Sequence, residues 1–314
     1  MSGPGWREPT LATLTGRRFS DENWIFERKL DGVRAICVRD GGPPTLYSRN
    51  HKVMDNAYPE LVDALAAQGG PRFVADGEIV AFDGANTSFA ALQPRIHVSD
   101  PDRARATGVR VYYYLFDLLY FDDRDTTGLP LRQRKALLRD AFDFADPLRL
   151  SSHRNAEGEK FFEEACRRGW EGVIAKRADA PYRHWRSPDW LKFKCAQGQE
   201  LVIGGFTDPQ GARHGFGALL LGYHEDGALK YAGKVGTGFD ERLLTSLHAR
   251  LRERETARSP FAGPVKEPGA HWVRPELVAQ IGFSEWTRDG RLRHPRFAGL
   301  REDKKAADVV RERT

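Results

Sequence analysis

Lys29, in the run ERKLDGVR, is the first residue whose surroundings suggest covalent chemistry. A lysine amine attacks a phosphorus centre only in its neutral form, so such a lysine needs a pKa that nearby cations or loss of solvation have lowered. The same run is also typical of a surface hairpin, because Asp-Gly favours tight turns. A bare KxDG occurs by chance in roughly 8% of chains of this length. The run therefore indicates a reactive lysine only if other motifs accompany it.

Two more lysines come from the run WLKFK at residues 190–194. If this run is a strand, Lys192 and Lys194 lie on one face, with apolar side chains on the other. The two ammonium groups could then neutralise a triphosphate and lower the pKa of Lys29. Arg186, six residues before Lys192, is a further candidate for contacting a nucleotide. The alternative interpretation is an edge strand with a solvated lysine face.

Five other short motifs occur along the chain: SRN at residues 48–50, DGE at 76–78, FDLL at 116–119, EGVIAK at 171–176 and REDK at 301–304. The order, residue types and approximate spacing of the whole set resemble the covalent nucleotidyltransferase superfamily of ATP-dependent DNA ligases, RNA ligases and mRNA capping enzymes. The resemblance extends from about Pro9 to Lys304. It is greatest to the small bacterial end-joining DNA ligases of the ligase D and ligase C type, on stretches such as FSEWTRDGRLRHPRF and LRED.

The resemblance implies a nucleotide site around Lys29, which would attack the α-phosphate of ATP and hold AMP as a phosphoramidate. Glu27 lies two residues earlier, on the same face of the expected strand, and could bind the adenine or the ribose. Arg34 and Arg49 would offer forked donors to phosphate and sugar oxygens. Phe116 would stack on the adenine. His51 follows SRN where the family most often has glycine, which puts the geometry of that turn in question.

The resemblance also implies a divalent cation, Mg²⁺ or Mn²⁺. Glu78 would hold the ribose or a metal-bound water, and Glu171 would help hold the metal, because hard cations prefer oxygen ligands and bridge phosphates. Arg301 and Lys304 of REDK would close over the pyrophosphate during the first step and then move away. The alternative for REDK is a charged C-terminal helix.

The elements that must position these residues indicate an α+β protein with two domains. Runs rich in β-branched and aromatic residues predict strands at residues 24–28, 34–38, 45–48, 78–82 and 111–121. Apolar periodicity predicts helices at 58–68, 132–144 and 159–168. From the family we expect residues 1–197 to form a nucleotidyltransferase domain with ATP-grasp-like antiparallel sheets. Short β runs and one helix at 240–253 predict a small OB-fold β-barrel at 198–314.

The bulk properties constrain the function less. The formal charge of +5 over 314 residues suits a polyanionic partner but is common on other proteins. No stretch approaches the roughly 18 apolar residues that span a bilayer, so we expect a cytoplasmic protein, associated with the nucleoid in a bacterium, and no membrane contact. Cys37, Cys166 and Cys195 show no metal-site or disulfide spacing and are interpreted as reduced.

The leading interpretation is an ATP-dependent DNA ligase that seals 5′-phosphate/3′-hydroxyl breaks through lysyl-AMP, in DNA repair or end joining. The expected partners are nicked or broken duplex DNA, a Ku-type end-binding protein and an end-processing polymerase, and the chain is expected to be a monomer. An RNA ligase or a GTP-dependent capping enzyme shares most of the motifs, although the match around WTRDGRLRHPRF favours DNA. A non-catalytic OB-fold protein that binds single strands is the rival from another class.

Overall fold

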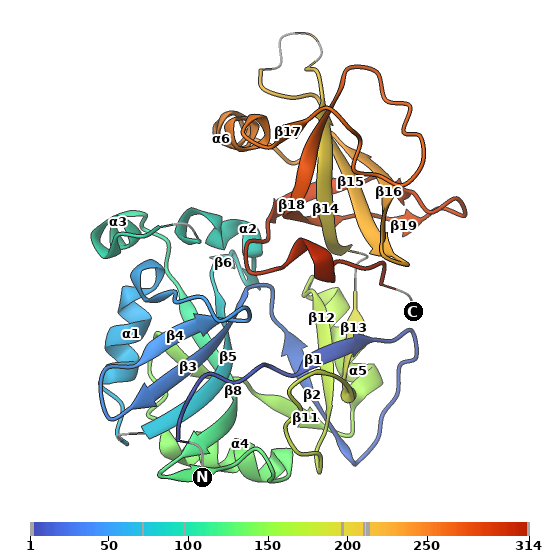
Figure 1. The fold of residues 1–314 in the computed structure, drawn as a ribbon. Helices are drawn as coiled ribbons and strands as arrows, with labels where there is room; N and C mark the ends of the chain where they lie inside the picture. The colour runs from blue at the N-terminus through green and yellow to red at the C-terminus, as the bar shows by residue number, and fades with distance from the viewer. Residues whose placement is uncertain are drawn as a thin grey trace. The chain divides into compact units, whose positions relative to one another are not determined.

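The structure, a computed structural model, describes residues 3–70, 72–96, 98–195, 198–209, 211 and 214–312. These residues belong to two compact units, Met1–Cys195 and Ala196–Arg313, which Figure 1 shows as blue to yellow-green and as yellow to red. Helices and strands both occur throughout the first unit, which confirms the expected α+β class. The two units are described separately below.

One sheet of the first unit carries the lysine motifs. Its strand order is β1 (Leu11–Leu14), β13 (Arg186–Lys194), β12 (Gly172–Arg177), β2 (Trp24–Lys29) and β11 (His153–Asn155). Phe26, Val173 and Phe193 point to one face of this sheet and pack with Phe161 of α5 (Gly158–Arg167). Because side chains alternate along a strand, the neighbours of these aromatic residues project from the opposite face, where the polar motif residues lie.

The second sheet of this unit holds the FDLL and DGE motifs. It runs in the order β10 (Leu148–Leu150), β8 (Tyr112–Phe121), β5 (Arg72–Val80), β3 (Val33–Asp40) and β4 (Thr45–Ser48), and β9 (Arg124–Asp125) pairs with β8. Gly77 of DGE is needed here, because a Cβ atom would lie 2.4 Å from the ring of Tyr113. An apolar cluster joins the two sheets by packing Phe116 and Leu119 of β8 with Trp190 of β13.

The remaining elements of the first unit flank these sheets. Leu61 and Leu65 of α1 and Leu138 of α4 pack in the core of the second sheet. The bounds of the elements are α1 (Pro59–Ala66), α2 (Phe89–Leu92), α3 (Pro101–Ala106), α4 (Leu131–Ala141), β6 (Phe82–Asp83), β7 (Asn86–Thr87), η1 (Asp55–Ala57) and η2 (Gln93–Arg95).

The second unit is built on one antiparallel sheet with its own core. The strand order is β16 (Ala228–Val235), β15 (Leu219–Glu225), β14 (Gly198–Thr207), β18 (Ala270–Gly282) and β17 (Glu255–Thr256), with β21 (Arg296–Leu300) on β18 and a hairpin of β19 (Glu285–Trp286) and β20 (Leu292–Arg293). The expected helix is α6 (Glu241–Arg252), where the Asp240 side chain accepts a hydrogen bond from the Leu243 amide at 2.7 Å. The last element is η3 (Ala306–Asp308).

The cysteines differ from the prediction. Cys166 and Cys195 form a disulfide, so the expectation that all three cysteines are reduced is wrong for this pair. The pair stands 29 residues apart in sequence, but α5 and the end of β13 bring the two Cα atoms within 5.2 Å of each other. Cys37 is the free, buried cysteine. In the described part of the chain, no helix has the length and apolar character to cross a membrane.

Candidate active site

Lys29 and Lys194 lie on one face of the first sheet with a glycine between them. Strand pairing places Lys29 opposite Gly172, and Gly172 opposite Lys194. Directly paired residues share a face, so both lysines project above a strand position without a side chain. Only glycine fits there, because the backbone has φ of 155° and a Cβ atom would lie 1.9 Å from the Phe193 carbonyl oxygen. The sequence thus places no side chain between the two lysines.

Two further sets of cross-strand neighbours on β2, β12 and β13 lie on the same face as Lys29. Glu27, Ile174 and Lys192 form the row next to Lys29, and Ile25, Lys176 and Trp190 form the row after that. The face therefore brings together the predicted residues Lys29, Glu27, Lys192 and Lys194.

Lys29 is held as a cation by neighbouring carboxylates. Its Nζ lies 2.5 Å from Glu171 Oε1. Burial lowers the pKa of Lys29, but the charges of Glu171, Asp31 and Glu78 outweigh burial and raise it. The expected lowering by Lys192 and Lys194 is therefore not found. Lys194 lies two strands away, about 10 Å, whereas the carboxylate of Glu171 is in direct contact.

Glu171 also has the oxygen that a divalent cation would need. Its Oε2 is buried and has no hydrogen-bond partner, although carboxylate oxygens are good ligands for Mg²⁺ and Mn²⁺. Glu78 acts electrostatically on Lys29, so its charge reaches the same site. Among the described residues, no group of three or more His, Cys, Asp or Glu side chains converges. The residues present fit an ion that takes its other ligands from phosphate oxygens and water.

Glu27 lies in a buried cluster with two lysines that the sequence analysis missed. Its carboxylate accepts from Lys135 Nζ at 2.7 Å, Lys176 Nζ at 2.9 Å and Ser151 Oγ at 3.2 Å. Burial alone would raise the pKa of Glu27, but the two ammonium groups lower it to about 2. Burial lowers the pKa of Lys176 to about 8, with Lys135 adding repulsion that offsets the attraction of Glu27. Glu27 is thus ionised between the two lysines, and Lys176 loses its proton at a lower pH than an ordinary lysine.

Phe116 and Arg34 are engaged within the protein. The ring of Phe116 is buried, with Lys176 Nζ at 4.1 Å and Arg34 Cζ at 4.7 Å from its centroid. The Arg34 guanidinium pairs with Asp76 through Nε to Oδ1 at 2.5 Å and Nη2 to Oδ2 at 2.6 Å, and Tyr182 donates to the same carboxylate. A base that stacks on Phe116 must displace one of the two cations.

The other site residues predicted in the first unit lie outside the face that carries Lys29. Glu78 on β5 pairs in register with Arg34 on β3. Arg49 is half-buried in the turn after β4. His51 in this turn has φ of 60°, so it keeps the left-handed conformation that glycine would favour. Arg186 is exposed at the start of β13, and its Nη1 donates to the Ala12 carbonyl at 2.6 Å.

Arg301 and Lys304 are held by carboxylates of the second unit. Arg301 is buried and pairs with Asp303 at 2.8 and 2.7 Å, which lowers the pKa of Asp303 although burial would raise it. Lys304 lies 3.2 Å from Glu200. This segment forms turns rather than the charged helix considered as an alternative. Movement of these two residues over a pyrophosphate stays a prediction.

Comparison with protein families agrees with this arrangement. The family described as "ATP dependent DNA ligase domain" matches residues 10–194, more than half of the chain, and "ATP dependent DNA ligase C terminal region" matches residues 212–304. The chain belongs to the ATP-dependent DNA ligases. Its two units therefore have the ligase arrangement of a nucleotidyltransferase domain followed by an OB-fold domain, which confirms the expected fold.

Individual ligases extend the comparison. The chain is 38% identical to the multifunctional non-homologous end joining protein LigD of Pseudomonas aeruginosa over 99% of its own length, but spans 37% of that protein. It is 35% identical to DNA ligase C of Mycobacterium tuberculosis, covering 86% of this chain and 83% of that protein. The solved structure of mycobacterial DNA ligase D complexed with ATP and MES superposes with a TM-score of 0.70 at 36% identity, covering 98% of both chains. The chain thus spans about two-fifths of the length of its LigD relatives.

Proposed function

We propose that this chain joins a 5′-phosphate to a 3′-hydroxyl in duplex DNA through a covalent AMP adduct on Lys29, in the repair of breaks. The observation that carries the proposal is the face on which Lys29 and Lys194 flank Gly172, with Glu171 in contact with Lys29. A nucleophile, cations for a polyphosphate and a carboxylate for a divalent cation are the groups that nucleotidyl transfer requires.

The proposed reaction has three steps. The amine of Lys29 attacks the α-phosphorus of ATP, so that an N–P bond forms and the bond to pyrophosphate breaks. The 5′-phosphate oxygen of the DNA then takes the AMP from Lys29. The 3′-hydroxyl attacks the activated 5′-phosphate and releases AMP. Lys192 and Lys194 would neutralise phosphate charge, while Glu171 and Glu78 would hold a Mg²⁺ or Mn²⁺ ion that neutralises the pyrophosphate.

The Glu27 cluster supports ATP over GTP. An ionised carboxylate only accepts hydrogen bonds, and an ammonium group only donates them. Glu27 beside Lys176 therefore offers an acceptor next to a donor. Adenine carries an amino donor beside a ring-nitrogen acceptor, whereas guanine carries a carbonyl acceptor beside an N–H donor. The cluster matches the first pattern and opposes the second, which disfavours the GTP-dependent alternative.

A direct test compares nucleotides and then nucleic acids. We expect the full chain to form an acid-labile, radiolabelled protein band with α-labelled ATP and Mg²⁺ or Mn²⁺, and much less with GTP. The adenylylated chain should then seal nicked DNA in preference to nicked RNA. Absence of a labelled band would refute the proposal, and sealing of RNA alone would establish the RNA-ligase alternative.

The pH dependence of the first step tests the role of Glu171. Glu171→Gln keeps the size of the side chain but removes the charge that raises the pKa of Lys29, so the neutral amine forms at lower pH. The profile of adduct formation against pH should move toward lower pH, and more Mg²⁺ should be needed. Glu163→Gln, an exposed acid on α5, is the matched control and should leave the profile unchanged. An unshifted profile in Glu171→Gln would contradict this role.

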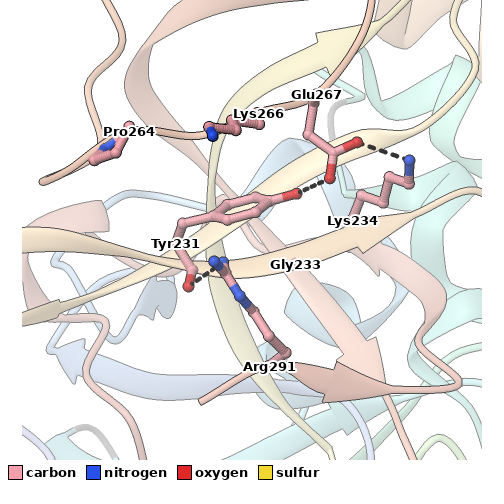
Figure 2. A pocket seen from close by; sticks show the side chains of 7 residues that line it. All are labelled: Tyr231, Gly233, Lys234, Pro264, Lys266, Glu267 and Arg291. Atoms are coloured by element: carbon pink, nitrogen blue, oxygen red, sulfur yellow. Dashed lines mark hydrogen bonds and ion pairs between the residues drawn. The ribbon is translucent and has the colours of Figure 1, made fainter. Parts of the chain in front are cut away.

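A basic recess in the second unit supports a nucleic-acid substrate. The recess has a volume of about 420 Å³ and lies between β16, the loop before β18 and the β19–β20 turn. Figure 2 shows Tyr231 at its centre, with Glu267 bonded to the Tyr231 hydroxyl at 2.9 Å and to Lys234 at 2.7 Å. Arg291 stacks 4.2 Å from the Tyr231 ring centroid and donates to its carbonyl oxygen.

The charges of this recess leave an excess of cations. Glu267 offsets Lys234, so Lys266 and Arg291 remain for an outside anion, and no hydrogen bond or ion pair holds Lys266 among the described residues. Arg291 is held in place by Tyr231 and keeps further N–H groups for binding. The phosphodiester backbone of DNA is the anion that the proposed function supplies.

The salt dependence of DNA binding tests this contact. Each phosphate contact contributes about 0.9 to the slope of log K against log salt, so Lys266→Ala with Arg291→Ala should reduce the slope by about 2. Adduct formation on Lys29 should be unaffected. Arg242→Ala with Arg258→Ala removes two charges outside the recess and serves as the control. Equal slopes for the two double variants, measured by titration of nicked duplex, would contradict the contact.

We also propose that the chain acts at double-strand ends with a Ku-type end-binding protein and an end-processing polymerase, at the nucleoid. The support is the similarity to LigD relatives that are named multifunctional end-joining proteins. Stimulation of linear-duplex joining by a purified Ku-type protein would be the expected result. Nick sealing without any stimulation of end joining would refute it.

A further inference from the structure

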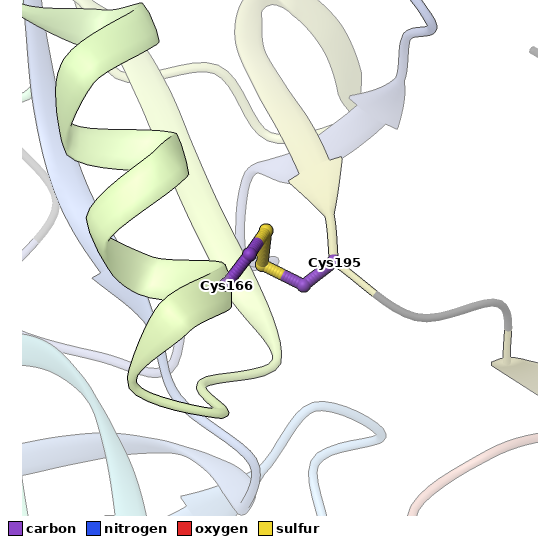
Figure 3. Close-up of a disulfide and its surroundings, with 2 residues drawn as sticks. All are labelled: Cys166 and Cys195. Atoms are coloured by element: carbon purple, nitrogen blue, oxygen red, sulfur yellow. A yellow bond between two sulfur atoms is a disulfide. The ribbon is translucent and has the colours of Figure 1, made fainter.

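The Cys166–Cys195 disulfide joins the two ends of the segment that contains Glu171, the residue whose carboxylate contacts Lys29. Figure 3 shows Cys166 on the last turn of α5 and Cys195 just beyond the end of β13. Glu171 lies on the segment between α5 and β12, five residues after Cys166. Cys195 directly follows Lys194. The disulfide therefore closes a covalent loop that contains both Glu171 and Lys194.

Backbone hydrogen bonds connect this loop to the site. The amide of Cys195 donates to the Glu171 carbonyl oxygen at 3.0 Å, and the amide of Gly169 donates to the Cys166 carbonyl oxygen at 3.0 Å. Glu171 in turn lies 2.5 Å from the nucleophile. The two cysteines thus lie at the ends of the backbone segment that carries Glu171, and we expect them to influence the position of its carboxylate.

Both cysteines of the disulfide are partly exposed, whereas the third cysteine is buried. Cys166 and Cys195 are half-buried, and Cys37 is fully buried. Burial raises the pKa of the Cys37 thiol, which keeps it protonated and unreactive. We therefore expect thiol exchange at Cys166 and Cys195, and Cys37 provides a control cysteine within the same chain.

We propose that Cys166 and Cys195 form a reversible thiol–disulfide modification site that controls how fast Lys29 is adenylylated. The co-reactants are low-molecular-weight thiols and their disulfides. One small thiolate attacks a sulfur of the Cys166–Cys195 bond and gives a mixed disulfide and one protein thiol. A second small thiol completes the exchange, giving two protein thiols and one small disulfide, with two electrons and two protons transferred to the protein.

The disulfide form is the faster form. With the bond in place, the segment carrying Glu171 and the end of β13 carrying Lys194 are tied together. Reduction leaves the Cys195 amide bond to Glu171 and the pairing of β12 with β13, but it frees the end of α5, where the segment carrying Glu171 begins, from the end of β13. Cys166 and Cys195 are positioning residues. Cys195 contacts the Glu171 backbone, Cys166 is connected to it through Gly169 and the intervening chain, and neither is placed among the reacting groups. This inference rests on the proposed adenylylation of Lys29.

The test uses the full chain in two redox states. We expect the chain treated with excess dithiol to form the lysyl-AMP adduct roughly tenfold more slowly than the oxidised chain, since small misplacements of reacting groups have effects of this size or larger. The maximal rate should fall more than the apparent affinity for ATP, because the disulfide positions Glu171 and Lys194 and does not itself contact the nucleotide. Reoxidation with a small disulfide should restore both.

Variants separate this role from simple stabilisation. Cys166→Ser and Cys195→Ser should both resemble the reduced chain and no longer respond to thiols, whereas Cys37→Ala should respond like the unaltered chain. Measurements are made well below the Tm of each form. A purely stabilising disulfide would change the Tm and leave the maximal rate of adduct formation unchanged, which would overturn the proposal. Absence of any adduct in both redox states would instead refute the proposed function.

Discussion

Lys29→Met is expected to abolish the covalent nucleotide adduct, with a loss of at least about 10³-fold in overall sealing. The variant removes the nitrogen that attacks phosphorus, and the neighbouring Lys192 and Lys194 lie on other rows or strands of the same face. Lys29→Arg should be equally inactive, because a guanidinium stays protonated and is a poor nucleophile. The measurement is the labelled protein band after denaturing electrophoresis, followed by sealing of a nicked duplex.

The third chemical step provides the control for this variant. A nick that already carries AMP on its 5′-phosphate needs no lysine adduct, so Lys29→Met should still seal it with the divalent cation alone. Lys160→Met, at an exposed lysine of α5, should keep all steps. A labelled band that persists in Lys29→Met and maps to Lys192 or Lys194 would show that the nucleophile has been misassigned.

Glu27→Gln is expected to destabilise the chain by about 3–5 kcal/mol, the cost of leaving buried charges without a partner. Lys135 and Lys176 both lose their common anion in this variant. Part of the loss should be recovered as pH rises, at a pH below the value of about 8 that Lys176 has beside Glu27, because removal of the Glu27 charge lowers the pKa of Lys176 further and lets it shed its proton. Urea unfolding at neutral and alkaline pH measures both effects. The selection of ATP over GTP in adduct formation should fall as well.

The stability of the chain at acid pH provides a second test of the Glu27 cluster. Glu27 has a pKa of about 2 in the folded chain, well below the roughly 4.3 of an unfolded glutamate. Its contribution to stability is therefore full above the unfolded value and is lost as pH falls through this interval toward 2. The original chain should lose stability there, and Glu27→Gln should lose less.

Lys135→Met is the matched comparison for Glu27→Gln. It leaves Glu27 and Lys176 as a neutral pair, so it should cost clearly less than removal of the shared anion. If the two variants were equally unstable, the stability of the cluster would come from packing and not from charge.

Much of the fold could be predicted because local pattern and final structure agree. Strands β2, β3, β4 and β8 and helices α1, α4, α5 and α6 lie within a few residues of the predicted ranges. One strand was misjudged. β5 begins at Arg72, not at residue 78, because Asp76-Gly77 signals a turn from sequence. In the fold, the buried partners Arg34 and Tyr182 satisfy Asp76, so the strand continues through this pair.

The candidate site was partly predictable for the same reason. Period-two alternation places Glu27 with Lys29, and Lys192 with Lys194, without knowledge of the fold. The partners that set their charge states come from distant segments. Lys135 lies four residues after Leu131 and three before Leu138, so helical spacing places it on the buried face of α4, but the sequence does not show that Glu27 is its partner there. The sign of the shift at Lys29 also depends on the 2.5 Å contact with Glu171, which motif spacing does not reveal.

The Glu171 contact also bears on how the chain avoids damage between reactions. A neutral amine in a cell meets carbon dioxide, aldehydes and acyl phosphates, and it can be modified by each of them. An ammonium group has no lone pair to offer and is inert to all three. Because Glu171 raises the pKa of Lys29, we expect the resting chain to resist such accidental modification. We then expect Lys29 to become reactive when a bound nucleotide and its metal ion compete for Glu171, and to stay protonated at other times.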